Sequence, residues 1–284
     1  MKIGALSESF LLPIHEVIET SVKLGLDGLQ LYAAKGELTP DNLDKHAKKK
    51  LVAHMRDAGL LCSAVCGDLG GHGFQMAEEN PLKIERSKAI ANLAIELETQ
   101  VITTHIGVIP KDVHCDLYHV MQEACYELGE YAHKKGAIFA IETGPEPILR
   151  LKGFLDSLHT KGMGVNYDPA NLLMVLNEDP VPGVSILGDY IVHTHAKDGV
   201  HLAASDPVSV YDAFAKGGIA GFDFGNYFNE TPLGEGSVAW DAYIHALKAT
   251  GYDGFLTIER EIGINPIQDI QAAVTMLRGL LEKI

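Results

Sequence analysis

The chain has 284 residues, of which 46% are hydrophobic, and 38 acidic residues against 23 basic ones give it a formal net charge of −15. This composition suits a full hydrophobic core and shows no sign of disorder. The negative charge repels phosphate backbones, so nucleic acid is not expected as a partner. No apolar run reaches the roughly 18 residues of a membrane-spanning helix, so no membrane association is expected either.

The N-terminal residues and the cysteines indicate a cytoplasmic location. Residues 1–6 lack the long apolar core of a signal peptide and read as a strand. The four cysteines include no Cys-x-x-Cys pair and have no zinc-finger spacing with histidines: Cys62, Cys66, Cys115 and Cys125. Reduced thiols in a cytoplasmic protein are the expected state.

Short apolar runs alternate with amphipathic segments along the whole chain. The runs are rich in Val, Ile, Leu and Ala and are bounded by Gly, Asp or Pro, which is typical of strands buried on both faces. The predicted strands are Lys2–Leu6, Gly28–Tyr32, Leu61–Cys66, Val101–His105, Ala137–Thr143, Gly164–Asp168, Tyr190–Ala196 and Gly254–Glu259. The predicted helices are Ile14–Leu24, Pro40–Ala58, Pro81–Leu97, Leu117–Lys135, Pro147–Leu158, Pro180–Leu187, Ala239–Ala249 and Ile267–Leu281.

Eight strands that alternate with helices predict a parallel sheet, because parallel neighbours need a crossover connection. Eight such units in about 250 residues match a (β/α)8 TIM barrel. An open doubly wound sheet is the alternative, but no Gly-x-Gly-x-x-Gly follows the first strand. Without a linker or a shift in composition, residues 1–284 are expected to form one α/β domain.

The connection after the seventh strand is longer than the others. It contains a surplus loop of about thirty residues, spanning roughly residues 199–232. The loop carries six aromatic residues: Tyr211, Phe214, Phe222, Phe224, Tyr227 and Phe228. Because loops after barrel strands lie on the catalytic face, this one could cover the mouth as a lid. A subunit contact in a homo-oligomer, or a satellite core, explains the aromatic residues equally well.

Four polar side chains end four successive predicted strands. They are Glu142, Asp168, His195 and Glu259, and each follows an apolar run and precedes a turn-like stretch. If these strands are neighbours in a closed barrel, their ends converge on one mouth. Three carboxylates and one imidazole predict a site for one divalent metal ion, with Mn²⁺, Mg²⁺ or Co²⁺ favoured and Zn²⁺ compatible with the imidazole.

Strand alternation turns His193 inward as well as His195, so either imidazole could be the ligand. His195 is preferred because it lies nearer the mouth. A metal that holds the carbonyl and hydroxyl oxygens of a sugar acidifies the neighbouring C–H and stabilises an enediolate. Glu142 and Glu259 could then remove and return a proton from opposite sides, which would epimerise the carbon.

Five motifs in this order resemble the xylose-isomerase-like TIM-barrel superfamily, and within it the sugar phosphate isomerase/epimerase group. They are residues 141–146 (Ile-Glu-Thr-Gly-Pro-Glu), 166–171 (Asn-Tyr-Asp-Pro-Ala-Asn), 193–198 (His-Thr-His-Ala-Lys-Asp), 232–236 (Pro-Leu-Gly-Glu-Gly) and 258–261 (Ile-Glu-Arg-Glu). The resemblance covers essentially the whole chain. It implies that Glu142, Asp168, His195 and Glu259 bind the metal, with both glutamates acting as acid and base, as in ketose 3-epimerases.

The chain departs from ketose 3-epimerases at three substrate contacts. Asn171 stands where those enzymes carry a His, His201 where they carry an Arg, and Ile148 where they carry a Glu, although Glu146 is near. These departures put epimerisation of a free hexulose in doubt but leave metal binding untouched. The expected substrate-binding residues at the mouth are His105, Asn171, Lys197, Gln30 and His72.

Other activities of the superfamily remain as alternatives. Members that dehydrate keto-cyclitols or dehydroshikimate use the same metal but expel a β-hydroxyl group. A sugar-binding protein without turnover is a third interpretation. Endonuclease IV shares a ligand position with His105, but Asn171 and the Leu-Gly-Glu-Gly stretch depart from its metal ligands. The substrate is expected to be a neutral or weakly anionic small sugar, although Gly234, Gly236 and Ser237 could form a phosphate site after the seventh strand.

Overall fold

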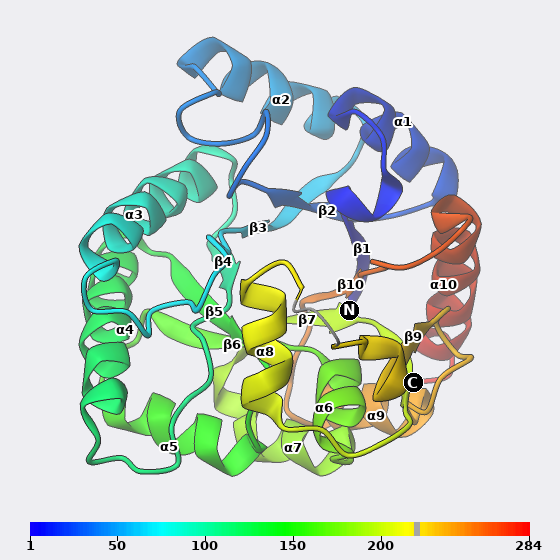
Figure 1. Cartoon of the computed structure of the whole chain (residues 1–284). Coiled ribbons are helices and arrows are strands. Elements are labelled where there is room, and N and C mark those ends of the chain that lie inside the picture. The colour runs from blue at the N-terminus through cyan, green and yellow to red at the C-terminus, as the bar shows by residue number, and fades with distance from the viewer. Residues whose placement is uncertain (219–221) are drawn as a thin grey trace.

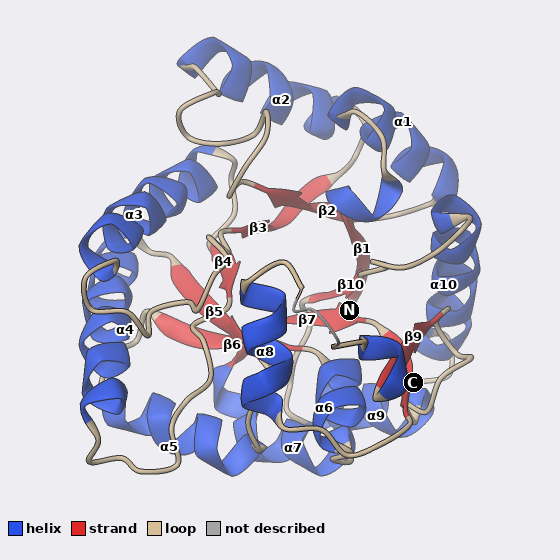
Figure 2. Cartoon of the chain, in the orientation of Figure 1, coloured by secondary structure: helices blue, strands red, loops and turns tan. Residues whose placement is uncertain are grey.

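A closed barrel of eight parallel strands forms the centre of the computed structural model, which describes residues 1–218 and 222–284 (Figures 1 and 2). Around the barrel the strands follow the order β1-β10-β7-β6-β5-β4-β3-β2. Their bounds are β1 Lys2–Leu6, β2 Gly28–Tyr32, β3 Leu61–Cys66, β4 Val101–Thr104, β5 Ile138–Glu142, β6 Met163–Tyr167, β7 Ile191–Ala196 and β10 Phe255–Ile258. The predicted (β/α)8 barrel is confirmed, with each strand end within one residue of its predicted position.

Helices surround the barrel, as Figure 2 shows. They are α1 Ile14–Leu24, α2 Lys45–Asp57, α3 Asn80–Glu96, α4 Asp116–Lys135, α5 Ile148–Leu158, α6 Pro169–Leu176, α7 Pro180–Leu187, α9 Trp240–Ala249 and α10 Pro266–Leu281, with 3-10 turns η1 Ser7–Phe10 and η2 Gly188–Tyr190. The predicted start of α2 at Pro40 is wrong. The side chain of Asp44 caps this helix by accepting from the backbone N–H groups of His46 and Ala47, so the helix begins at Lys45.

The barrel has a polar interior and an apolar outer face. Leu29 of β2 is fully buried, while Gln30 next to it points to the axis. Gln30 donates to Thr103 of β4 and contacts His193 of β7 across the barrel, and His193 also lies 2.9 Å from Thr257 of β10. These buried polar groups are stable there because they bond to one another.

The segment between β7 and β10 is folded, so the prediction of a plain loop over residues 199–232 is wrong. Strands β8 (Asp198–His201) and β9 (Phe228–Thr231) pair antiparallel, with α8 (Pro207–Ala215) and η3 (Phe224–Asn226) between them. Residues 219–221 of the predicted loop lie outside the described residues. Figure 1 shows α8 across the open end of the barrel. We call residues 198–231 the insertion.

Within the described ranges, none of the helices combines the length and the hydrophobicity needed to cross a bilayer.

Candidate active site

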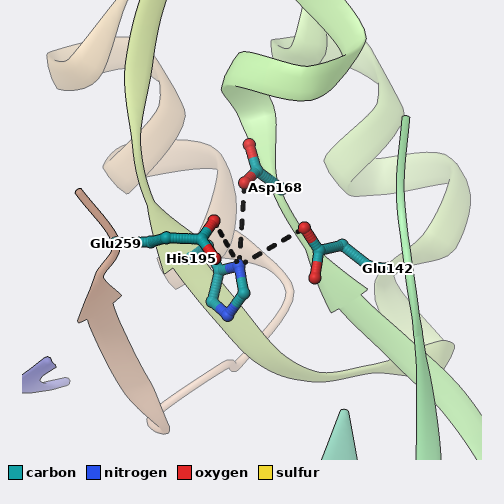
Figure 3. A group of neighbouring side chains, drawn as sticks. All are labelled: Glu142, Asp168, His195 and Glu259. Atoms are coloured by element: carbon teal, nitrogen blue, oxygen red, sulfur yellow. Dashed lines mark ion pairs between the residues drawn. The ribbon is translucent and has the colours of Figure 1, made fainter. Parts of the chain in front are cut away.

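The four predicted ligands meet at the barrel mouth. One ligand atom from each of Glu142, Asp168, His195 and Glu259 can be chosen so that all four lie within 4.8 Å of one another, and all four residues are buried. The Nδ1 atom of His195 lies 3.5 Å from Glu142, 3.7 Å from Asp168 and 3.2 Å from Glu259. Figure 3 shows the two glutamates approaching from opposite sides of the imidazole.

The carboxylate of Asp168 has two separate tasks. Its Oδ1 accepts from the backbone N–H groups of Ala170 and Asn171, so it caps α6. Its Oδ2 is buried and accepts no hydrogen bond from the described part of the chain. Thr143, after β5, bonds to both the N–H and the carbonyl of Asp168, which ties the ends of β5 and β6 together. The free oxygen is therefore held at the cluster by a fixed backbone.

Gln30, inside the barrel, orients the imidazole of His195. The Nε2 atom of this imidazole lies 3.1 Å from Oε1 of Gln30, the same oxygen that contacts His193. In this contact Nε2 donates to Gln30, so Nδ1 faces the carboxylates. Although burial opposes the charged ring, the carboxylates raise its pKa, and Nδ1 becomes the ligand atom when it gives up its proton to a metal ion. His193, the alternative ligand, lies within the barrel interior, where burial first and the charge of His195 second lower the pKa of its ring well below the ordinary value.

The Glu142 side of the cluster contains residues that could contact a substrate. Asn171 donates to Oε1 of Glu142 at 2.9 Å, and Nε2 of His105 lies 3.7 Å from the same oxygen. His105 pairs through Nδ1 with Asp68 at 3.1 Å. Although burial opposes the charged ring, Glu142 and Asp68 raise the pKa of His105 to about 10. The imidazolium can therefore stabilise negative charge beside Glu142.

Lys197 fixes the Glu259 side. Its ammonium group donates to Glu259 at 3.1 Å and to Glu261 at 2.8 Å. Burial would raise the pKa of Glu259, but the charges of His195 and Lys197 hold it well below the ordinary value. The pKa of Glu142 is lowered in the same way: burial would raise it, but the charges of His195 and His105 outweigh this effect. Both glutamates are thus ionised, as metal ligands and proton acceptors must be.

The donor set fits a divalent cation. Three buried carboxylates carry more negative charge than one imidazole balances, and Oδ2 of Asp168 is a buried acceptor with an unused lone pair. Oxygen-rich sets of this kind favour Mg²⁺, Mn²⁺ or Co²⁺, and the imidazole also suits Zn²⁺. The identity of the ion stays a prediction.

A cavity of about 530 Å³ opens above the cluster. Among the predicted substrate-binding residues, His105, Asn171 and Lys197 line this cavity. Tyr211 of α8 covers it and approaches the end of β5, where a Cβ at Gly144 would lie 2.4 Å from the Tyr211 hydroxyl. The insertion therefore reaches the Glu142 side of the mouth.

Two predicted substrate-binding residues lie elsewhere. Gln30 is fully buried inside the barrel, where it orients the metal-binding imidazole of His195 and does not line the cavity. His72 pairs with Asp212 of α8 at 2.8 Å, so it holds the insertion. His201, which stands where ketose 3-epimerases carry an Arg, bonds through Nδ1 to the backbone carbonyl of Met174. Glu146 is buried, is not among the residues that line the cavity, and accepts a hydrogen bond from the N–H of Ile109.

The backbone N–H groups after β7, where a phosphate site was an option beside a simple tight turn, are bonded within the chain itself. The N–H groups of Gly234 and Val238 donate to the carboxylate of Asp198, at 2.9 Å and 3.1 Å. A Cβ at Gly236 would lie 2.1 Å from the same carboxylate, and Ser237 N–H donates to a backbone carbonyl. The chain's own anion thus occupies the place where a phosphate would bind.

Sequence reasoning missed several residues of the site. Asp68 follows β3 and pairs with His105 at the mouth. Glu230, on β9, is buried beside Arg260 and accepts from the backbone of Glu261. Arg260 itself points away from the axis toward Asp269 and Glu230, as strand alternation predicts. Asp68 stands two residues after β3, a signal of the same kind as that of the ligands that was not used, whereas Glu230 carried no local signal in the sequence.

Residues 18–280 match the family model described as the xylose isomerase-like TIM barrel. Among solved structures, the xylose isomerase domain protein from Planctomyces limnophilus aligns with a TM-score of 0.81 and 24% identity, over 100% of this chain and 97% of that chain. The probable 3-DHS dehydratase AsbF from Bacillus anthracis aligns with a TM-score of 0.76 and 19% identity, over 98% of this chain and 99% of that chain. The 3-keto-D-glucoside 4-epimerase YcjR from E. coli aligns with a TM-score of 0.72 and 16% identity, over 98% of this chain and 99% of that chain. None of the curated proteins matches in sequence. At these identities, the structural likeness concerns the fold.

Proposed function

We propose that this chain, which belongs to the xylose isomerase-like TIM-barrel family, is a divalent-metal-dependent isomerase or epimerase of a small sugar or sugar derivative. The observation that carries the proposal is the buried cluster of Glu142, Asp168, His195 and Glu259, with its two glutamates on opposite sides (Figure 3). The cavity above it gives a substrate access to the Glu142 side.

The two glutamates supply the proton transfers. When bound, the metal ion would hold two neighbouring oxygens of the substrate and acidify the C–H beside its carbonyl. One glutamate removes this proton, and the other returns a proton to the opposite face of the same carbon. Asn171 and Lys197 keep Glu142 and Glu259 in place through hydrogen bonds. His105, held by Asp68 beside Glu142, lines the cavity and can donate a hydrogen bond to a substrate oxygen on which negative charge develops.

A neutral or weakly anionic substrate fits the charges around the cavity. Its lining contains five carboxylates, those of Asp68, Glu142, Asp223, Glu230 and Glu261, and the ammonium group of Lys197 is already paired with two glutamates. The anion site after β7 is filled by Asp198. A phosphorylated sugar would meet repulsion without a dedicated anion site, so we favour a substrate without phosphate.

The test combines metal analysis with isotope exchange. Protein purified without chelator should contain about one divalent ion per chain. In D₂O it should introduce deuterium at the carbon beside the carbonyl in a screen of ketoses, ketose phosphates and keto-cyclitols. Glu142→Gln and Glu259→Gln should abolish exchange, whereas Glu146→Gln, which changes an equally buried carboxyl outside the cluster, should retain it. Exchange that survives in both cluster variants would refute the role of the two glutamates. A strong preference for phosphorylated sugars would refute the proposed substrate without phosphate.

Dehydration is the second candidate, and the fold shared with the probable 3-DHS dehydratase AsbF is the observation that favours it. The same deprotonation would then expel a β-hydroxyl group, and mass spectrometry would find a product 18 mass units lighter. A sugar-binding protein would instead bind its ligand without any exchange. A cytoplasmic location and a homo-oligomer stay predictions.

A further inference from the structure

The cavity is lined by both polar and apolar side chains. Near the metal ligands it is lined by polar groups, among them those of Glu142, Asn171 and Lys197. The rest of the lining contains a group of apolar residues that the reaction does not use. We call this group the apolar wall: Met174, Val175, Phe214, Phe224, Phe228 and Ile262.

The rings of the insertion form a continuous series that starts beside the active site. His105 lies 6.3 Å from the ring of Tyr211, and Tyr211 lies 6.1 Å from Phe214. Phe214 stacks on Phe224 with 4.2 Å between ring centroids, and Phe224 lies 6.0 Å from Phe228. Phe214 is nevertheless half exposed, so packing inside the insertion leaves part of its surface free. Because Phe214 also lines the cavity, this ring can contact a bound molecule as well as Phe224.

The cavity is larger than a monosaccharide requires. Its volume of about 530 Å³ lies within the roughly 300–1,000 Å³ of pockets that bury drug-sized ligands, which are larger than a hexose. A hexose bound at the metal ligands therefore leaves part of the cavity, including the apolar wall, to another group.

We propose that the substrate is a polyhydroxylated ring that carries a planar apolar substituent, and that the apolar wall binds this substituent. The position of the polyhydroxylated ring rests on the proposed function. The substituent lies against Phe214 and Phe224, where aromatic rings prefer to stack, and buries apolar surface that is otherwise exposed. Specificity then comes from the insertion, while the chemistry comes from the barrel.

A pair of unreactive glycosides with the same sugar tests this inference. Phenyl β-D-glucopyranoside should bind the metal-loaded protein about tenfold or more tightly than methyl β-D-glucopyranoside in calorimetric titrations. Phe214→Ser and Ile262→Ser should each reduce this preference while leaving the affinity for the methyl glycoside unchanged. Both residues are more than half exposed, so the variants should fold. Val208→Ser is the matched control, because Val208 is an exposed residue of α8 outside the wall.

Equal affinity for the two glycosides, binding of neither, or loss of both affinities in Phe214→Ser would overturn the inference. The two proposals fail separately. A phenyl preference without isotope exchange on any sugar would refute the reaction but keep the apolar wall as a binding site. Exchange on small free ketoses without a phenyl preference would refute the apolar wall alone.

Discussion

Glu146 should make the protein less stable as the pH rises. Its side chain is 2% exposed, and in the described part of the structure its carboxylate accepts one hydrogen bond, from the backbone N–H of Ile109 at 3.3 Å. Burial, opposed weakly by this hydrogen bond and by Arg150, raises the pKa of the carboxyl from 4.5 to about 8. Between pH 4.5 and about pH 8, the carboxyl of Glu146 has released its proton in the unfolded chain but still holds it in the folded chain. The contribution of this carboxyl to stability is therefore most favourable at low pH, falls through this window, and levels off above pH 8.

The size of the effect follows from the two pKa values. Each unit corresponds to about 1.4 kcal/mol, so the carboxyl should cost about 4 kcal/mol of unfolding free energy between pH 5 and pH 9. Glu146→Gln keeps the shape and removes the titration. Urea unfolding of both proteins across this range should give similar stabilities at pH 5 and a variant that is more stable by about 4 kcal/mol at pH 9.

The difference between the two proteins isolates this carboxyl, because the other titrating groups are common to both. Glu123→Gln serves as the control, since Glu123 is exposed on α4 and its replacement should change stability by less than about 0.5 kcal/mol. If the gap between wild type and Glu146→Gln stays constant from pH 5 to pH 9, the carboxyl does not keep its proton in the folded state and the reasoning is refuted.

Three further perturbations probe the metal centre and the insertion. Gln30→Leu removes the acceptor that orients His195 and should weaken metal binding about 10- to 100-fold in competition with a chelator, whereas an unchanged affinity would leave Gln30 only a packing role. Removing the metal should lower the unfolding free energy by about 3 kcal/mol relative to protein held at a hundredfold excess over Kd, as measured by urea unfolding, and no change would argue against a resident ion. Deleting residues 205–228 should reduce turnover far more than metal content if the insertion is a lid. A change of oligomeric state in light scattering as the first effect would show an interface instead.

The sequence was sufficient to predict the barrel and its ligand cluster because both depend on local patterns. Buried parallel strands read as apolar runs, and a Glu, Asp or His after such a run is visible without knowledge of the partners. Glu142, Asp168, His195 and Glu259 all occupy this position, and barrel closure alone brings them together. The preference for His195 over His193 followed from the direction of the strand.

The features that were missed depend on contacts between distant residues or on capping signals that were not used. Strand β8 follows β7 almost directly and is recognisable only by its pairing with β9, about thirty residues later. Helices α6 and α8 each begin at an Asp-Pro step, Asp168-Pro169 and Asp206-Pro207, in which the aspartate caps the helix. N-capping aspartate followed by proline at the first helical position would have predicted both helices.

The carboxylate of Asp198 bears on how a barrel of this kind could acquire a phosphate site. It accepts from the N–H groups of Gly199, Gly234 and Val238 and from the indole of Trp240, so the scaffold carries its own anion covalently at this end of the barrel. A free anion cannot compete with one that is always present at its site. The donors after β7 are thus already used by the side chain of Asp198, independently of the lining of the cavity. Loss of this one side chain would leave oriented donors behind, a ready starting point for acquiring affinity for phosphorylated sugars.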